Sequence, residues 1–315
     1  MTPIAVVICA YTTERWERLV DAVESVLAQS LPPDELIVVI DHNDELLERA
    51  RAAFPRARVV ASEGEPGISG ARNTAVRHAS APVIAFLDDD ARADPGWLEA
   101  LAPWYADPDT IGVGGHIEPD WDGEPPGWFP AELNWAVGGT HRGVPTRVAP
   151  VRNLFGSNMS FRREALEDAG GFRTEMGRVG RSRMSCEETE LAIRATLRRP
   201  GSVVLHVPGA RVEHSVRAAG TTWRYLVRRC WAEGLSKALV AQNVGRYAGL
   251  ASERSYVARV LPVGVASGLR DAARGEPHGA GRAAAIVLAL ATTGAAYAYG
   301  AAAAQAGRIR ERNGR

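Results

Sequence analysis

The first part of the sequence is dominated by three runs of consecutive apolar residues, at 4–9, 36–40 and 83–87. Runs of this length without alternating polar residues are typical of strands that are buried on both faces. Amphipathic helical patterns at 15–28 and 71–79 lie between them. Strands that alternate with helices favour an α/β fold, in which helices cover both faces of a largely parallel sheet.

Polar side chains follow each of these runs directly. Thr12 and Thr13 follow the first run, residues 41–44 the second and three aspartates, at 88–90, the third. Because ligands of such sheets bind at the carboxyl ends of the strands, we expect the three polar clusters to meet at one edge of the sheet.

The three aspartates predict a divalent-metal site. Carboxylates that directly follow five buried apolar residues are costly unless a cation balances them. Hard oxygen ligands suit Mg²⁺ or Mn²⁺, and such an ion can neutralise the charge that develops on a departing diphosphate. The alternative is a solvated acidic turn, which is the ordinary interpretation of a charge run.

The composition argues against several other classes of protein. Lys237 is the only lysine, which excludes a Walker A phosphate loop and a lysine Schiff base elsewhere in the chain. Cys9, Cys186 and Cys230 are far apart and lack the spacing of zinc ligands. Residues 112–115 lack the third spaced glycine of a dinucleotide-binding loop, and no motif supports nucleic-acid binding.

The charge is unevenly distributed, and the C-terminal part is basic. Residues 1–214 carry 22 basic and 32 acidic side chains, whereas residues 215–315 carry 15 and 5. A basic amphipathic pattern with tryptophan at 221–244 predicts either a membrane-surface helix or a helix packed on the domain. Residues 283–307 carry no charge, but 13 of these 25 residues are alanine. A spanning helix, a surface or re-entrant helix and a docked soluble helix therefore all remain open for this segment.

Seven motifs in a fixed order connect the sequence to a known family. They are VVICAYT (6–12), VVID (38–41), GISGARN (67–73), FLDDD (86–90) with Pro95 five residues on, GSNMSFR (156–162), GGF (170–172) and EETEL (187–191). With these motifs, residues 3–240 resemble the family 2 glycosyltransferases, which are inverting enzymes of the GT-A fold. The resemblance implies a Rossmann-like mixed sheet that binds a nucleotide-diphosphate sugar.

The resemblance also implies roles for single residues on the donor side. It places Ala10, Thr12 and Glu14 beside the base and ribose, and Asp41 at the imide N–H of the base. Further donor contacts implied are Arg72 near the base and phosphates, Asp89 at the ribose, Asp88 as a supporting carboxylate and Asn158 in the floor under the sugar.

Metal ligands and a base follow from the same resemblance. The metal ligands implied are Asp90, Asp88 and His214, although His214 is equally well explained as a core histidine at a strand end. Glu188 occupies the position of the family's aspartate general base, and Glu187 is the alternative base. Glutamates here can also simply complement the dipole of a helix N-terminus.

More narrowly, a combination of four segments resembles the glucosyl-dolichyl-phosphate glucuronosyltransferase-like branch: Tyr11-Thr12, Asp41-His42-Asn43, Trp223-Arg224-Tyr225 and the tryptophan-rich residues 118–150. We interpret residues 118–150 as a long insertion over the site. We expect a GT-A domain at 1–215, with a nucleotide-binding half at about 1–117 and an acceptor-side half at about 118–215. A basic helical region at 216–315 would follow, with a candidate membrane helix at 283–307.

The expected activity is metal-assisted, inverting transfer of a sugar from a nucleotide-diphosphate donor to a hydroxyl of a glycan or polyprenyl-phosphate-linked sugar acceptor. The expected donor is a UDP-sugar. Because an ionised lipid phosphate needs no base, Glu188 favours a hydroxyl acceptor. The alternatives are a transferase with a lipid-phosphate acceptor and a non-catalytic sugar-nucleotide or lipid-binding module. The expected location is the cytoplasmic face of the cell membrane, either peripheral or with a single span.

Overall fold

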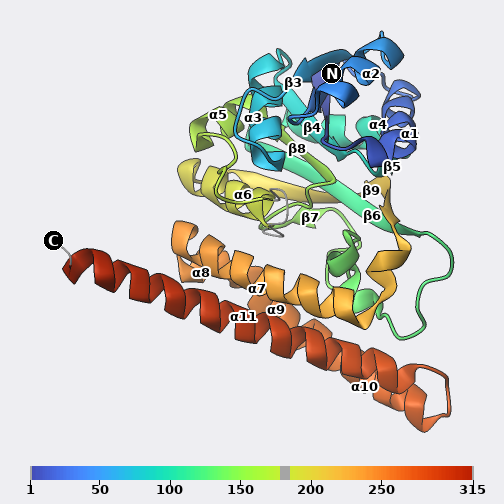
Figure 1. The fold of residues 1–315 in the computed structure, drawn as a ribbon, viewed down its shortest axis with the longest axis vertical. Helices are drawn as coiled ribbons and strands as arrows, with labels where there is room; N and C mark the ends of the chain where they lie inside the picture. Colours follow the sequence, from blue (N-terminus) through green and yellow to red (C-terminus); the bar gives the residue numbers. More distant parts are fainter. Residues whose placement is uncertain (1, 178–184, 314–315) are drawn as a thin grey trace. The chain divides into compact units, whose positions relative to one another are not determined.

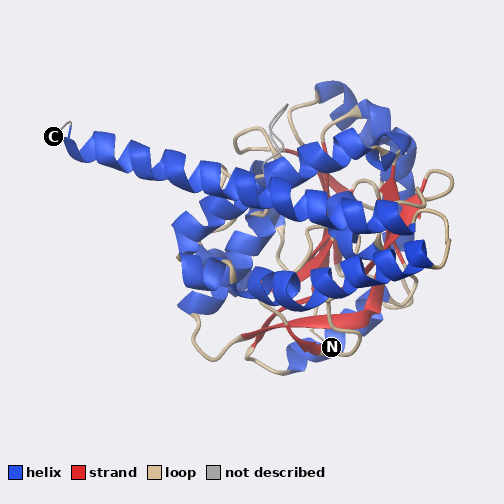
Figure 2. Ribbon diagram, turned by 90° about the horizontal axis from the view of Figure 1, so that it is seen from below, coloured by secondary structure: helices blue, strands red, loops and turns tan. Residues whose placement is uncertain are grey.

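A computed structural model describes residues 2–177 and 185–313 of the chain (Figure 1). The chain divides into two compact units. The first, the sheet unit, comprises Met1–Asp120, Pro145–Ser182 and Glu187–Ser215. The second, the helical unit, comprises Trp121–Val144, Arg183–Cys186 and Val216–Arg315 and consists mainly of helices (Figure 2).

A single sheet of nine strands has the order β3-β2-β1-β4-β8-β6-β9-β5, with β7 paired to β9. The strands are β1 (Ile4–Ala10), β2 (Glu35–Ile40), β3 (Arg58–Ala61), β4 (Val83–Asp88), β5 (Ala91–Ala93), β6 (Thr110–Trp121), β7 (Ala149–Pro150), β8 (Asn158–Arg162) and β9 (Val203–Val216). Strands β1 to β4 are parallel, whereas β8 is antiparallel to both β4 and β6. The predicted mixed α/β sheet is therefore confirmed.

Six α-helices belong to the described part of the sheet unit. They are α1 (Trp16–Leu27), α2 (Asp44–Ala53), α3 (Ile68–His78), α4 (Trp97–Leu101), α5 (Arg163–Ala169) and α6 (Glu187–Arg198), with short 3₁₀ turns η1 (Thr13–Arg15) and η2 (Ala102–Ala106). Alternate residues of β1 enter different cores: Val6 and Ile8 pack with α1, and Val7 packs with α3. Burial on both faces explains why these strands are apolar throughout.

The register of the parallel strands brings their polar ends together. Ala10 of β1 lies opposite Ile40 of β2, and Cys9 lies opposite Asp88 of β4. The polar residues that follow these strands therefore emerge at one edge of the sheet, as predicted.

Residues 203–216 form one long strand, β9, which contains Pro208 and Gly209. In the structure they lie between the residues that pair with β7 and those that pair with β5. A proline is tolerated at such an interruption between two pairings of a strand.

The helical unit is built around α7 (Trp223–Val244) and α11 (Gly279–Asn313). The other elements are η3 (Ala131–Val137), η4 (Ala218–Thr221), α8 (Arg246–Gly249), α9 (Ala251–Ser255), the π-helical turn η5 (Tyr256–Val260) and α10 (Leu261–Ala273). Residues 121–144, which lie within the predicted insertion, group with this unit and include η3. The expected boundary between residues 215 and 216 stays a prediction.

Small residues allow α7 and α11 to approach closely. A Cβ atom added at Gly234 of α7 would lie 2.3 Å from the carbonyl oxygen of Thr293 and 2.6 Å from Cβ of Ala296. Farther along, a Cβ atom at Gly300 of α11 would lie 2.9 Å from Cβ of Ala238. The two helices therefore run in the same direction with their backbones nearly in contact.

We expect Gly234→Ala to lower the free energy of unfolding by about 1–3 kcal/mol, because the new methyl group must push the α11 backbone away. Gly294→Ala is the matched control, since within the described chain its added Cβ meets no atom beyond the backbone of its own helix within 4 Å. That control should stabilise the helix by roughly 0.5–1 kcal/mol. Thermal unfolding followed by circular dichroism measures both changes, and equal shifts in the two variants would contradict the close packing.

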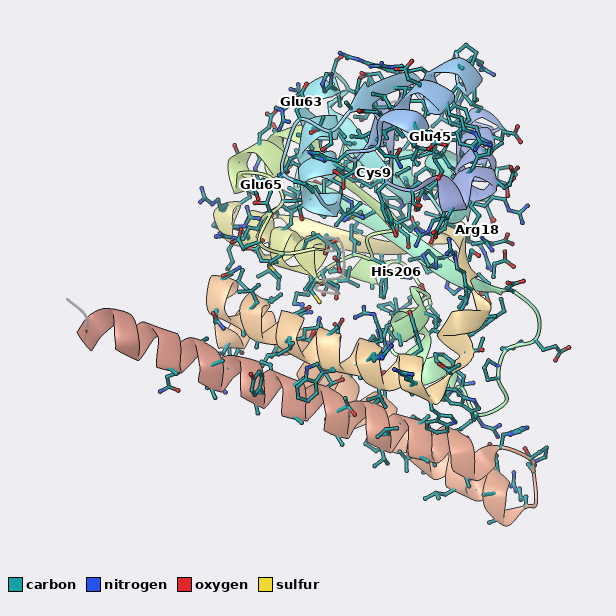
Figure 3. All side chains as sticks on the ribbon, viewed as in Figure 1. Cys9, Arg18, Glu45, Glu63, Glu65 and His206 are labelled. Carbon is teal, nitrogen blue, oxygen red and sulfur yellow. The ribbon has the colours of Figure 1, made fainter. Side chains whose placement is uncertain are left out.

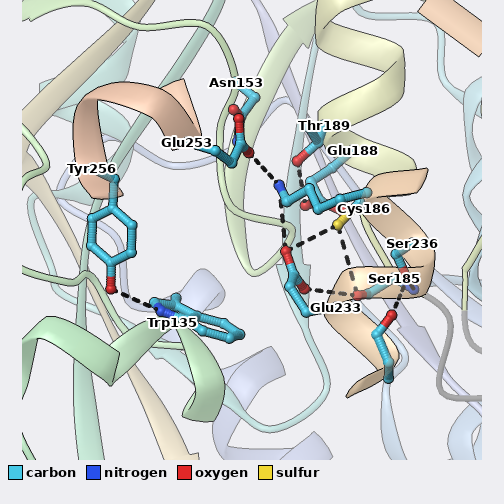
Figure 4. Close-up of polar contacts among 12 residues, drawn as sticks. Trp135, Asn153, Ser185, Cys186, Glu188, Thr189, Glu233, Ser236, Glu253 and Tyr256 are labelled. Atoms are coloured by element: carbon cyan, nitrogen blue, oxygen red, sulfur yellow. Dashed lines mark hydrogen bonds and ion pairs between the residues drawn. The ribbon is translucent and has the colours of Figure 1, made fainter. Parts of the chain in front are cut away.

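A network of partly buried charges crosses the helical unit (Figure 4). Glu233 contacts Arg229 at 2.9 Å and Lys237 at 3.3 Å, and Lys237 also contacts Glu253 at 2.7 Å. Burial raises the pKa of Glu233, but the positive charges of Lys237 and Arg229 outweigh this effect and lower it from 4.5 to about 2. The ionised form of Glu233 is thus stabilised by the fold.

Since the folded-state pKa of Glu233 is depressed, its ionisation stabilises the fold above about pH 4.5. That contribution, on the order of 3 kcal/mol, is lost as the pH falls from about 4.5 to about 2. We expect Glu233→Gln to be less stable than the wild type at neutral pH and to show a shallower decline across this window. Denaturant unfolding at several pH values tests this, with the exposed Glu124→Gln as control. Parallel pH profiles for wild type and Glu233→Gln would refute it.

Candidate functional site

The aspartates after β4 form a cluster with a histidine of β9. Ligand atoms of Asp88, Asp90 and His214 all lie within 4.8 Å of one another. His214 Nε2 lies 3.3 Å from Asp90 Oδ1, and His214 pairs with Ala91 across the β5–β9 ladder. Two carboxylates and one imidazole are a donor set that fits a divalent ion. The structure therefore brings together the three residues predicted as metal ligands.

Asp89, which was predicted to contact the ribose, is buried in the structure. Its exposed fraction is 4%, and its Oδ1 accepts a hydrogen bond from Arg15 Nη1 at 2.8 Å. Its Oδ2 is buried and has no hydrogen-bond partner among the residues that the structure describes. Burial and the neighbouring charge of Asp90 raise the pKa of Asp89 to about 7, although Arg15 acts in the opposite direction.

Arg15 is a site residue that the sequence interpretation missed. Its Nη1 lies 2.8 Å from Asp89 Oδ1 and 2.9 Å from Asp90 Oδ2. Burial lowers the pKa of Arg15, but the charges of Asp90 and Asp89 outweigh this effect, so the guanidinium stays ionised. The sequence did offer a signal for Arg15: it is a basic residue five positions after the end of β1, at the sheet edge where the acidic triplet was expected.

Arg72 of α3 links the acidic triplet to the N-terminus of α6. It is 3% exposed, and its Nη2 lies 3.2 Å from Asp88 Oδ1 while its Nη1 lies 2.9 Å from Glu187 Oε1. Its Nη2 also donates to the carbonyl oxygen of Gly156 at 3.1 Å. Three segments that are distant in the sequence are thus joined by one side chain.

The residues predicted to meet the base and ribose lie together at the ends of β1 and β2. The backbone N–H of Asp41 donates to the carbonyl of Ala10 at 2.8 Å, and Asp41 Oδ2 accepts from the N–H of Gly67 at 2.8 Å. Thr12 Oγ1 accepts from the N–H of Glu14 at 3.2 Å, and the Glu14 side chain is exposed. Asp41 is therefore already engaged in fixing the turn that precedes α3.

Asn158, which was predicted to lie in the floor under the donor sugar, is held inside the sheet. It is fully buried, and its Oδ1 accepts from the indole N–H of Trp97 at 2.9 Å. Its Nδ2 donates to the carbonyls of His116 at 3.0 Å and Ala210 at 2.9 Å. The amide joins β8 to β6, β9 and α4, so the side chain supports the sheet from within. Its place under the donor sugar stays a prediction.

The three glutamates at the start of α6 have distinct surroundings. Glu187 is buried against Arg72, and Glu190 is buried in ion pairs with Arg173 at 3.0 Å and Arg194 at 2.7 Å. Glu188 is partly exposed and accepts a hydrogen bond from Thr189 Oγ1 at 3.0 Å. Of these carboxylates, Glu188 is the one accessible to a substrate.

Cys9 directly precedes the site residues of β1, but its side chain is a neutral thiol rather than a reactive thiolate. It lies inside the sheet unit on β1 (Figure 3), and burial raises the pKa of its thiol to about 12. A neutral buried thiol is a poor nucleophile.

Removal of a ligand from the Asp88–Asp90–His214 cluster should weaken metal binding. We expect His214→Ala and Asp90→Asn to raise the dissociation constant for Mn²⁺ by at least about tenfold, because each removes a donor atom. Titration calorimetry measures this directly. Glu213→Gln is the matched control, since Glu213 neighbours His214 but lies outside the cluster and pairs with Arg92. Equal affinity in all three variants would show that the ion binds elsewhere.

Comparisons with known proteins agree with this geometry. The family model described as Glycosyl transferase family 2 matches residues 5–170. A glucosyl-dolichyl phosphate glucuronosyltransferase of Haloferax volcanii is 37% identical over 238 residues, covering 74% of this chain and 76% of that protein.

Solved structures share the fold at low identity. The mannosyltransferase PcManGT of Pyrobaculum calidifontis, in complex with GDP-Man and Mn²⁺, has a TM-score of 0.58 at 17% identity, covering 93% of this chain and 87% of that one. GalNAc-T7, with UDP, GalNAc and Mn²⁺, has a TM-score of 0.53 at 15% identity, covering 88% of this chain and 58% of that one. The chain therefore belongs to glycosyl transferase family 2 and is a glycosyltransferase of the GT-A fold.

Proposed function

We propose that the protein transfers a sugar, with inversion, from a nucleotide-diphosphate donor such as a UDP-sugar to a hydroxyl of a glycan or polyprenyl-phosphate-linked sugar. The observation that carries this proposal is the bridge made by Arg72, which contacts both Asp88 and Glu187. Glu187 directly precedes Glu188, so one ion-paired framework supports both a metal-binding cluster and an accessible carboxylate.

On the donor side, Ala10, Thr12, Glu14 and Asp41 are proposed to surround the base and ribose at the ends of β1 and β2. Asp88, Asp90 and His214 would hold Mn²⁺ or Mg²⁺, which offsets the charge of the diphosphate leaving group. The two solved relatives support this assignment, because each contains Mn²⁺ together with a nucleotide or nucleotide-sugar. Arg15 and Arg72 would keep the aspartates in place while the donor binds.

On the acceptor side, Glu188 is proposed as the general base. Its carboxylate would take the proton of the acceptor hydroxyl while the oxygen attacks the anomeric carbon from the face opposite the diphosphate. The new glycosidic bond forms as the bond to the diphosphate breaks, so the configuration at that carbon inverts. Glu187 is the weaker candidate for the base, because its carboxylate is committed to Arg72.

A polyprenyl-linked acceptor fits two further observations. The Haloferax relative is named for a glucosyl-dolichyl phosphate, which is a polyprenyl-phosphate-linked sugar. Among the described helices, one segment, Gly279–Ala306 of α11, has the length and apolar composition of a membrane helix. We therefore propose that the protein works at the membrane, on its cytoplasmic face.

A donor screen with a base variant tests the proposal. Purified protein should bind one nucleotide-diphosphate sugar in the presence of Mn²⁺ and transfer it to a sugar hydroxyl. Glu188→Gln should bind that donor with unchanged affinity but lower kcat by about 10²–10⁴-fold. Glu167→Gln, an exposed glutamate of α5 paired with Arg163, is the control and should retain full activity. Unimpaired turnover by Glu188→Gln would remove this residue from the role of base.

A further inference from the structure

The apolar residues of α7 divide between two faces. Leu226 and Cys230 are buried in the core of the helical unit. Trp223, Val227 and Trp231 follow one another at intervals of four residues, and 37%, 37% and 43% of their surfaces are exposed. Residues four apart lie on the same side of a helix, so these three form one exposed apolar stripe.

Helix α11 extends this stripe. The ring of Tyr299, 64% exposed, lies with its centroid 6.1 Å from that of Trp231. Leu288 is also exposed and precedes Tyr299 by eleven residues, about three helical turns, so both lie on the same side of α11. We call Trp223, Val227, Trp231, Leu288 and Tyr299 the tryptophan surface. Exposed apolar side chains that are gathered in this way mark a binding surface.

Charge identifies the partner that suits this surface. Arg224 and Arg228 each follow a residue of the stripe by one position, and both are exposed. Tryptophan and tyrosine are favoured at the boundary between headgroups and acyl chains, while arginine binds anionic headgroups. An apolar aromatic stripe with an adjacent row of arginines therefore fits the surface of an anionic bilayer.

The packing of α11 decides how it meets a membrane. Gly234 of α7 lies against Thr293 and Ala296 of α11, and on the same stretch of α7 Arg229 and Lys237 form ion pairs with Glu233. If α11 crossed the bilayer with α7 attached, these charges would enter the hydrocarbon region, which is strongly unfavourable. If α11 crossed the bilayer without α7, the two helices would separate and the core that they share around Leu226 would be exposed.

We propose that α7 and α11 together form an interfacial membrane anchor. The two helices lie in the plane of an anionic bilayer, with the tryptophan surface in the acyl boundary and Arg224 and Arg228 among the headgroups. The long apolar segment of α11 then does not span the membrane. This inference goes beyond glycosyl transfer and does not depend on it, since vesicle binding requires neither donor nor acceptor.

Co-sedimentation of the full-length protein with vesicles tests the surface. Binding to phosphatidylcholine vesicles that contain phosphatidylglycerol should exceed binding to pure phosphatidylcholine. Arg224→Gln combined with Arg228→Gln should weaken binding to the anionic vesicles by about 25-fold, at roughly one factor of five for each arginine. Arg56→Gln, an exposed arginine of the sheet unit, is the matched control and should bind as the wild type does.

A second variant and its control test the contribution of the apolar residues of the tryptophan surface to vesicle binding. Trp231→Ser should reduce binding to anionic vesicles by at least about tenfold, whereas Leu197→Ser, which alters an exposed leucine of α6, should leave it unchanged. Circular dichroism confirms that each variant is folded. Equal binding by Trp231→Ser and Leu197→Ser would overturn the assignment of the surface.

Two further measurements separate the proposed anchor from its rivals. Protein bound in the plane of the bilayer should be released from vesicles by high salt or alkaline carbonate, and retention after both treatments would show a spanning α11 instead. Analytical ultracentrifugation without lipid should give the same sedimentation for the wild type and Trp231→Ser. A dimer that dissociates in Trp231→Ser would show that a second copy of the chain, not a bilayer, covers the tryptophan surface.

Discussion

The buried guanidinium of Arg72 is the interaction on which the candidate site depends. It contacts Asp88 at the end of β4 and Glu187 at the start of α6, two residues that are far apart in the sequence. A buried charge that loses one partner is strongly destabilising, so the two carboxylates and Arg72 must stay together in the folded protein. The bridge also fixes the backbone at Glu188, because Glu188 directly follows Glu187 in the chain.

The charges around this bridge explain why a cation suits the site. Four carboxylates, those of Asp88, Asp89, Asp90 and Glu187, face two guanidiniums, those of Arg15 and Arg72. Fully ionised, this set carries two excess negative charges, which a divalent ion would balance. The raised pKa of Asp89 is consistent with this excess of negative charge, because burial and the charge of Asp90 oppose the ionisation of its carboxyl group. The two arginines thus orient the aspartates without neutralising them completely.

The sequence predicted those features that depend on local pattern. Unbroken apolar strands and the polar residues after them were sufficient to place Asp41 and Asp88 at one edge of the sheet, because neighbouring parallel strands end together. The side chains of Asn158 and Arg15 could not be assigned in this way. The amide of Asn158 is used by three backbone and side-chain groups from distant segments, and Arg15 finds its carboxylates only when β1 and β4 pair. Such roles arise from tertiary contacts that no spacing in the sequence encodes.

The same distinction applies to α7 and α11. Hydropathy alone left α11 open as a spanning, surface or docked helix, since length and composition are equally compatible with all three. The decisive fact is three-dimensional: Gly234 brings α11 against the stretch of α7 in which Arg229 and Lys237 are paired with Glu233. The basic residues of the C-terminal region therefore fall into two groups. The paired, partly buried charges stabilise the helical unit and oppose insertion, while the exposed Arg224 and Arg228 remain available to an anionic surface. A helix that is apolar enough to enter a membrane is thus held at its surface by the charges of the helix on which it packs.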